Sequence, residues 1–85
     1  MLEEYVRLAP NDFEGHYELG MAYEIQSERS LDEATTRRAA DELKRALSIQ
    51  PNHAMAHYYL GKAYRRLDLE DESEAEFELY ERLSS

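Results

Sequence analysis

Apolar residues recur at intervals of three and four over most of the chain, which is the spacing of one face of an α-helix. This pattern runs from Phe13 to about Gln26 and from Ala54 to Leu67, and it returns from Ser30 to Gln50 and from about Glu70 to Leu83. No alternating pattern of the kind that marks a strand continues for more than a few residues. The four stretches therefore predict an all-α fold.

Two prolines and one serine predict where the helices begin and end. Pro10 and Pro51 each disfavour helical backbone in the residue before them and cannot donate to the preceding turn, so each ends a helical stretch. The Ser30 hydroxyl can cap a helix in which Glu33, three residues later, returns the bond. We therefore expect a helix to begin at Ser30, with a protruding turn at residues 26–30.

The chain repeats itself with a displacement of 41 residues. The first copy begins at Pro10 and the second at Pro51, and each continues with His-x-x-Leu-Gly-x-Ala-Tyr, from His16 and from His57. A fixed period of about 20 to 50 residues is the signature of a solenoid of small supersecondary units. The repeat predicts stacked helix hairpins, so function is to be sought on a surface of the repeats rather than in a catalytic pocket.

These residues resemble the pattern of the tetratricopeptide repeat (TPR) family, in which Leu-Gly, Tyr, Ala, an aromatic residue and Pro follow in a fixed order. The matching residues are His16, Leu19, Gly20, Tyr23, Ala39, Leu43, Ala46 and Pro51 in the first repeat, and His57, Leu60, Gly61, Tyr64, Ser73 and Phe77 in the second. The resemblance covers essentially the whole chain. It implies a TPR-like right-handed α-solenoid of antiparallel helix pairs.

The resemblance also divides the single domain of residues 1–85 into parts. Residues 1–10 correspond to the end of a preceding second helix, residues 11–51 to a long first repeat and residues 52–85 to a C-terminal repeat. The first repeat is longer by seven residues than the roughly 34 of the family. Seven residues are about two helical turns, so both helices of the hairpin could lengthen by one turn. The other interpretation is an inserted loop.

The second repeat differs from the first on the side that would face a following hairpin. Ala40 and Leu47 of the first repeat correspond to Glu74 and Glu81 of the second. Terminal repeats need such a polar outer face. We therefore expect this chain to lie at the C-terminal end of a TPR-like array.

Composition disfavours several classes of function. The formal net charge of −9 over 85 residues disfavours nucleic acid, whose phosphates require an attractive field. The absence of cysteine excludes disulfides and thiolate metal sites. No apolar run approaches the roughly 18 residues of a membrane span, and the first residues lack the organisation of a signal peptide. We expect a cytoplasmic protein that binds no nucleic acid and no membrane.

In the TPR family the first helix of each hairpin lines a concave face, where partners bind. The residues that correspond to this face are Glu14, Tyr17, Met21 and Glu24 in the first repeat and Met55, Tyr58, Lys62 and Arg65 in the second. Tyr and Met offer adaptable apolar contact, and Lys62 with Arg65 could hold a carboxylate. The resemblance implies a protein-interaction module that binds a peptide or helix with an acidic or C-terminal carboxylate segment. Alternatively, these side chains only pack on neighbouring helices or meet solvent.

A structural role is the second hypothesis for the whole chain, either as the C-terminal cap of a longer scaffold or through homo-oligomerisation. A self-association seam could form on the last predicted helix, from Tyr80, Leu83, Leu79 and Ala75. Small helical hairpins that bury little apolar surface often gain stability by association.

Catalytic and metal-binding chemistry find little support in the sequence. His53 and His57 have the i, i+4 spacing of two zinc ligands, but no third ligand is evident and His57 occupies a packing position of the repeat. Carboxylates are abundant, yet no Ser, Cys or Lys is placed beside a base. We therefore expect no enzyme activity, no bound metal and no cofactor.

Overall fold

The computed structural model describes residues 12–85, and this part of the chain is all α-helical apart from turns. The four helices are α2 (Phe13–Ser30), α3 (Glu33–Ile49), α4 (Ala54–Arg66) and α5 (Glu70–Ser84). The all-α prediction is thus confirmed for residues 12–85. The helix end that was predicted for residues 1–10 lies outside the described residues.

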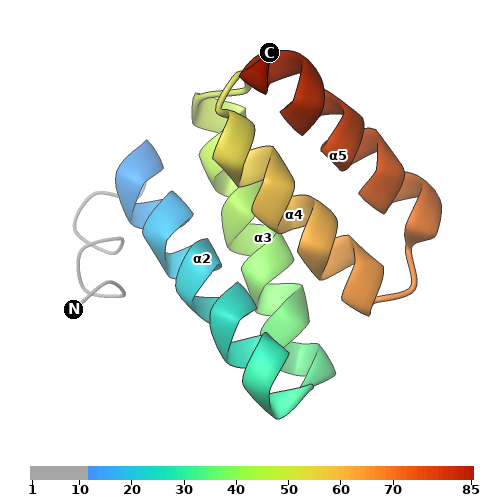
Figure 1. Cartoon of the computed structure of the whole chain (residues 1–85). Helices are drawn as coiled ribbons and strands as arrows, with labels where there is room; N and C mark the ends of the chain where they lie inside the picture. The colour runs from blue at the N-terminus through green and yellow to red at the C-terminus, as the bar shows by residue number, and fades with distance from the viewer. Residues whose placement is uncertain (1–11) are drawn as a thin grey trace.

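The helices form two antiparallel hairpins that lie side by side (Figure 1). Helix α2 pairs with α3, and α4 pairs with α5. The hairpins meet through α4. Its contacts with the first hairpin are mostly with α3 and to a smaller extent with α2. Because α5 packs only on α4 among these helices, α2 and α5 lie on opposite sides of the described structure (Figure 1).

The turn between α2 and α3 lies later in the chain than predicted. Helix α2 continues through the predicted turn to Ser30, and Leu31 then adopts a left-handed backbone with a φ of 57°. Ser30 is not the helix cap, because Asp32 directly precedes α3 and its carboxylate accepts a hydrogen bond from the Ala34 amide at 3.2 Å. An Asp in this position satisfies one of the free amide groups of the first turn.

The residues that make the first repeat long are helical. Between Tyr23 and Ala39 only Leu31 and Asp32 lie outside a helix. As a result α2 has 18 residues against 13 in α4, and α3 has 17 against 15 in α5. The first hairpin therefore extends past the end of the second.

Two glycines bring the helices of each hairpin close together. A β-carbon on Gly20 would lie 2.7 Å from Cγ of Leu43, and one on Gly61 would lie 2.9 Å from Cε1 of Phe77. Both distances are too short for carbon atoms in contact, which have their optimal separation at about 3.5 to 4.0 Å. The approach of the second helix therefore favours glycine at both positions, and most strongly at Gly20, where the Leu43 backbone nitrogen would also lie within 3.1 Å.

The core between the hairpins is small. It consists of the buried residues Ala40, Leu43, Leu60 and Ala63, around which Tyr17, Leu47, Tyr59 and Tyr64 are partly buried. Small residues at Ala40 and Ala63 allow α3 and α4 to pack closely, and tyrosine rings cover the edges. The core joins α3 of the first hairpin to α4 of the second and so holds the two hairpins together.

Candidate functional site

The two repeated histidines are buried and connect the helices of their hairpins. Nδ1 of His16 lies 2.7 Å from a carboxylate oxygen of Glu42, and Nδ1 of His57 lies 2.6 Å from one of Glu76. Nε2 of His57 also donates to the carbonyl oxygen of Pro51 at 2.7 Å, since a carbonyl can only accept. Both ring nitrogens of His57 are thus occupied by hydrogen bonds that tie α4 to α5 and to the preceding turn.

His53 has a different part in the fold. Its Nδ1 accepts a hydrogen bond from the Ala56 amide at 3.2 Å and so caps α4. The ring lies against Phe13 and Tyr17 of α2, with centroid distances of 4.7 and 4.8 Å. Among residues 12–85 no group of three or more His, Asp or Glu side chains is arranged to hold a metal ion.

A row of tyrosine rings crosses the molecule from α2 to α5. The ring of Tyr17 lies 6.2 Å from that of Tyr59, which lies 5.5 Å from Tyr58, and Tyr58 in turn lies 5.1 Å from Tyr80. Burial raises the pKa of the Tyr17 hydroxyl above its ordinary value of 10.0, with smaller contributions from Tyr59 and Glu18. Contacts between rings at such distances are favourable, and the four rings form a continuous row of contacts.

The aromatic row ends in a pocket of about 360 Å³ between α4 and α5. Its lining residues are Tyr58, Lys62, Arg65, Phe77, Tyr80 and Glu81. Nζ of Lys62 lies 5.6 Å from the Tyr58 ring, and the Arg65 guanidinium lies 5.0 Å from the Phe77 ring. Both distances suit a cation–π contact. The pocket, which we call the aromatic pocket, therefore combines apolar walls with two cations.

The Lys62 ammonium also interacts with carboxylates of α2. Its Nζ lies 3.8 Å from Glu24 and 3.7 Å from Glu28. Arg66, one turn later on α4, forms an ion pair with Glu24 and lies 3.5 Å from Glu28. Arg65, whose side chain is exposed, makes no ion pair among the described residues. Arg65 is thus the cation of the pocket that is most accessible to a partner.

The structure brings together some of the eight residues that the sequence singled out. Tyr58, Lys62 and Arg65 share the aromatic pocket. Glu14 and Tyr17 line a separate hollow of about 560 Å³, together with Asp12, Phe13, Glu18, Ile49, Gln50 and His53. Met21 is half-buried, and Met55 is exposed but lines neither pocket.

Glu24 lies in a different environment from the other seven residues. Its side chain is fully buried, and Arg66 and Lys62 surround its carboxylate. A partner could reach this carboxylate only by displacing one of the two cations. In the structure the side chain of Glu24 joins the hairpins instead of forming part of an accessible surface.

Sequence reasoning missed the residues that α5 contributes to the pocket. Phe77 and Tyr80 supply two of its three aromatic walls, and Glu81 lies at its edge. Taking the first helix of each hairpin as the whole binding face left these residues out. The signal that could have found them is the i, i+3 spacing of Phe77 and Tyr80, which places both rings on one face of the last helix.

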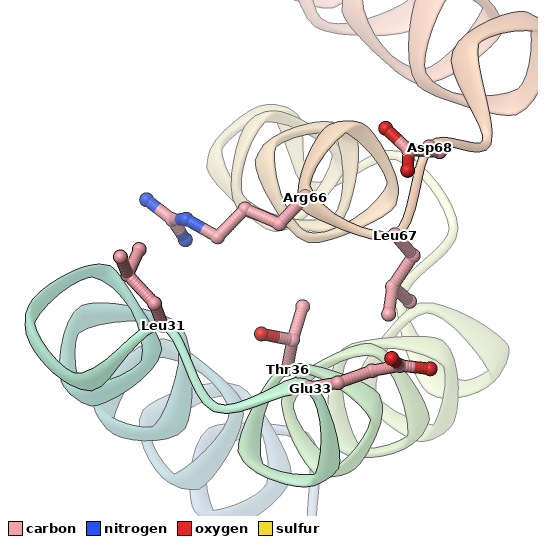
Figure 2. Close-up of a pocket in the computed structure, with 6 residues that line it drawn as sticks. All are labelled: Leu31, Glu33, Thr36, Arg66, Leu67 and Asp68. Carbon is pink, nitrogen blue, oxygen red and sulfur yellow. The ribbon is translucent and has the colours of Figure 1, made fainter.

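The extension of the first hairpin leaves a cleft beside the end of α4 (Figure 2). The cleft has a volume of about 460 Å³. Leu31, Glu33 and Thr36 line one side and Arg66, Leu67 and Asp68 the other. Because Arg66 lies at its edge and binds Glu24, the cleft marks the end of the contact between the hairpins.

Comparisons with known proteins give no relative for this chain. No protein-family model matches the sequence, and neither a curated protein nor a solved structure matches it. Within residues 12–85, none of the helices has the length and apolar character that crossing a membrane requires.

Proposed function

We propose that this chain is a non-enzymatic protein-interaction module with a TPR-like arrangement of helices, which binds a peptide or helix of a partner through the surface of α4 and α5. The 41-residue repeat, the two close-packed glycines and the hairpin pairing support the likeness to TPR solenoids. Such solenoids present rigid helices to extended partners.

The observation that carries the proposal is the aromatic pocket. Tyrosine and arginine are over-represented among the residues that dominate binding energy in protein interfaces. Here three aromatic rings and Arg65 surround one hollow on a chain whose net charge is −9. An apolar side chain of the partner would fill the hollow, and a neighbouring carboxylate would pair with the Arg65 guanidinium.

Selection from a random peptide library displayed on phage, with the 85-residue chain as bait, tests the proposal. We expect enrichment of peptides that combine an acidic residue with a large apolar one. The dissociation constant of an enriched peptide should rise by about tenfold or more in Arg65→Glu, since a charge-assisted contact is replaced by repulsion. Arg37→Glu is the matched control, because Arg37 is exposed on α3, away from the pocket.

Two results would reject the proposed function. One is the absence of any enriched peptide. The other is an equal loss of affinity in Arg65→Glu and Arg37→Glu, which would show that the charge of the whole chain governs binding and the pocket does not. The helix content of both variants, measured by circular dichroism, must equal that of the wild type.

The structural alternative keeps one observation in its favour, which is the exposure of apolar side chains on several helices. Ile25, Met55, Leu69 and Leu83 are each more than a third exposed. Singly exposed apolar residues are ordinary on protein surfaces, so the positions of these residues relative to charges decide whether any of them forms an interface.

A further inference from the structure

Helix α2 carries a stripe of four residues on the side that faces away from the core. Glu18, Ala22, Ile25 and Arg29 follow at intervals of four, three and four, so all four lie on one side of the helix. Ala22 and Arg29 are exposed, Ile25 is 44% exposed and Glu18 is partly exposed. We call these four residues the α2 stripe. Its spacing is that of the contact positions between paired helices.

The internal repeat shows that the counterpart of this face on α4 is covered by a helix. Ala63 corresponds to Ala22, and Ala63 is fully buried in a cluster with Ala40 and Leu43 of α3. Ala22 has the same small side chain but is exposed. The same small side chain therefore lies in a helix–helix contact in α4, whereas no helix of the range 12–85 covers it in α2.

The two charged ends of the α2 stripe have opposite signs. Glu18 lies on the N-terminal side of Ala22, and Arg29 lies on the C-terminal side of Ile25. Neither side chain makes an ion pair with another residue of the range 12–85. Eleven residues separate them, which is about 16 Å along the helix.

We propose that the α2 stripe is a seam through which two copies of this chain associate, with their α2 helices antiparallel about a two-fold axis. Glu18 and Arg29 lie at equal distances from the midpoint between Ala22 and Ile25. In an antiparallel pair Glu18 therefore faces Arg29 of the second copy, and Ala22 faces Ile25 of the second copy. Each end of the seam thus pairs opposite charges, and each central position pairs a large residue with a small one. A two-fold interface requires this self-complementarity.

The extension of the first hairpin supplies one of the charges in this seam. Arg29 lies in the last turn of α2, which continues to Ser30, whereas α4 ends at Arg66, the counterpart of Ile25. Helix α4 thus has no position that corresponds to Arg29. The longer α2 thus provides a positive charge at one end of the stripe, opposite in sign to Glu18 at the other end.

The acidic face of α5 argues against a head-to-tail contact between copies. In such a contact α5 of one copy would cover α2 of the next, as α3 covers α4. Glu74 and Glu81 stand on α5 where Ala40 and Leu47 stand on α3, so this contact would bury carboxylates against Ala22 and Ile25. Carboxylates without partners are costly to bury, whereas the antiparallel α2 pair buries none unpaired.

The test is sedimentation equilibrium of the full chain from about 10 µM to about 1 mM, the range of the weak association that a single helix pair provides. We expect a reversible monomer–dimer equilibrium in the wild type. Glu18→Arg and Arg29→Glu should each be monomeric alone, because like charges then face each other at both ends of the seam. An equimolar mixture of the two variants should again form dimers, because each end of the mixed pair joins opposite charges.

A variant of the other candidate seam is the control. Leu83→Glu changes an exposed apolar residue of α5 and should leave the dimer unchanged, whereas Ile25→Glu should abolish it. The proposal is overturned by a wild type that is monomeric throughout the range, by a dimer that survives Ile25→Glu or is lost in Leu83→Glu, or by a mixture of the charge variants that stays monomeric. Because the seam and the aromatic pocket share no residue, this result is independent of the peptide selection.

Discussion

The Arg66 guanidinium of α4 binds the fully buried carboxylate of Glu24 on α2, and this ion pair joins the two hairpins. The same guanidinium lies 3.2 Å from the Ser27 hydroxyl. The other oxygen of the Glu24 carboxylate has no hydrogen bond among the described groups, although Lys62 Nζ lies 3.8 Å away. The position of one hairpin relative to the other therefore depends strongly on Arg66.

Replacement of Arg66 by methionine should destabilise the protein by about 3 kcal/mol, because it leaves a buried carboxylate with only a distant cation. The double variant Glu24→Leu/Arg66→Met should recover most of this loss, since apolar side chains then replace both charges. Urea denaturation followed by circular dichroism measures both. Arg37→Met, which breaks the exposed pair with Glu33, should cost only about 0.5 kcal/mol. Equal losses in Arg66→Met and Arg37→Met would contradict the assigned role.

The two glycines should differ in their tolerance of alanine. At Gly20 the new β-carbon would meet Cγ of Leu43 at 2.7 Å and the Leu43 backbone nitrogen at 3.1 Å, and Leu43 is fully buried. At Gly61 it would meet the ring of Phe77, which is only half-buried and can move. We expect Gly20→Ala to cost about 1 to 3 kcal/mol and Gly61→Ala to cost clearly less. Thermal unfolding of the two variants compares them, and the reverse order would refute the packing argument.

Stability should fall at alkaline pH through two tyrosines. Burial raises the pKa of Tyr17 and of Tyr64 above 10.0, and Lys44 opposes only part of the shift at Tyr64. A group whose pKa is raised in the folded state stabilises that state below its unfolded pKa, and this stabilisation is lost as pH rises through the folded value. Urea midpoints of the double variant Tyr17→Phe/Tyr64→Phe should therefore decline less above pH 10 than those of the wild type. An identical decline would contradict this assignment.

The backbone of Leu31, in the turn between α2 and α3, is strained. Its φ of 57° is left-handed, and its side chain is 80% exposed, so the leucine contributes little packing to offset the strain. Leu31→Gly should stabilise the protein by about 0.5 to 1 kcal/mol. Leu31→Val should destabilise it, because a β-branched residue fits this conformation poorly. Differential scanning calorimetry of the pair tests the sign, and a stabilising valine would contradict the explanation.

The positions of the helices could be predicted from local signals. The first residues of α2 and α4 agree with the starts expected at Phe13 and Ala54, and α5 begins at Glu70 as expected. The start of α3 was wrong by three residues, because Ser30 and Asp32 are both good capping residues and the sequence alone does not rank them. In the structure α2 continues to Ser30, and Asp32 is the residue that caps α3.

The partners of charged side chains could not be predicted in the same way. Glu24 has the spacing of a surface residue on an amphipathic helix, and only the crossing of α2 and α4 places it beneath Arg66, 42 residues later in the chain. The His–Glu pairs could have been predicted in part. Glu42 and Glu76 occupy equivalent places in the two hairpins, but a displacement of 34 residues relates them, which the 41-residue repeat of the first helices conceals.

The two hairpins have similar contacts at the end where α2 and α4 begin, and they differ in length at the opposite end. The His16–Glu42 and His57–Glu76 contacts are 2.7 and 2.6 Å long although 26 residues separate the first pair and 19 the second. The length of the hairpin thus changes at the far end without disturbing these contacts near the first residues of α2 and α4. For protein engineering, the junction at Leu31 and Asp32 is consequently the place to graft a reporter peptide or a whole domain, since elongation there leaves the helix contacts at the opposite end intact.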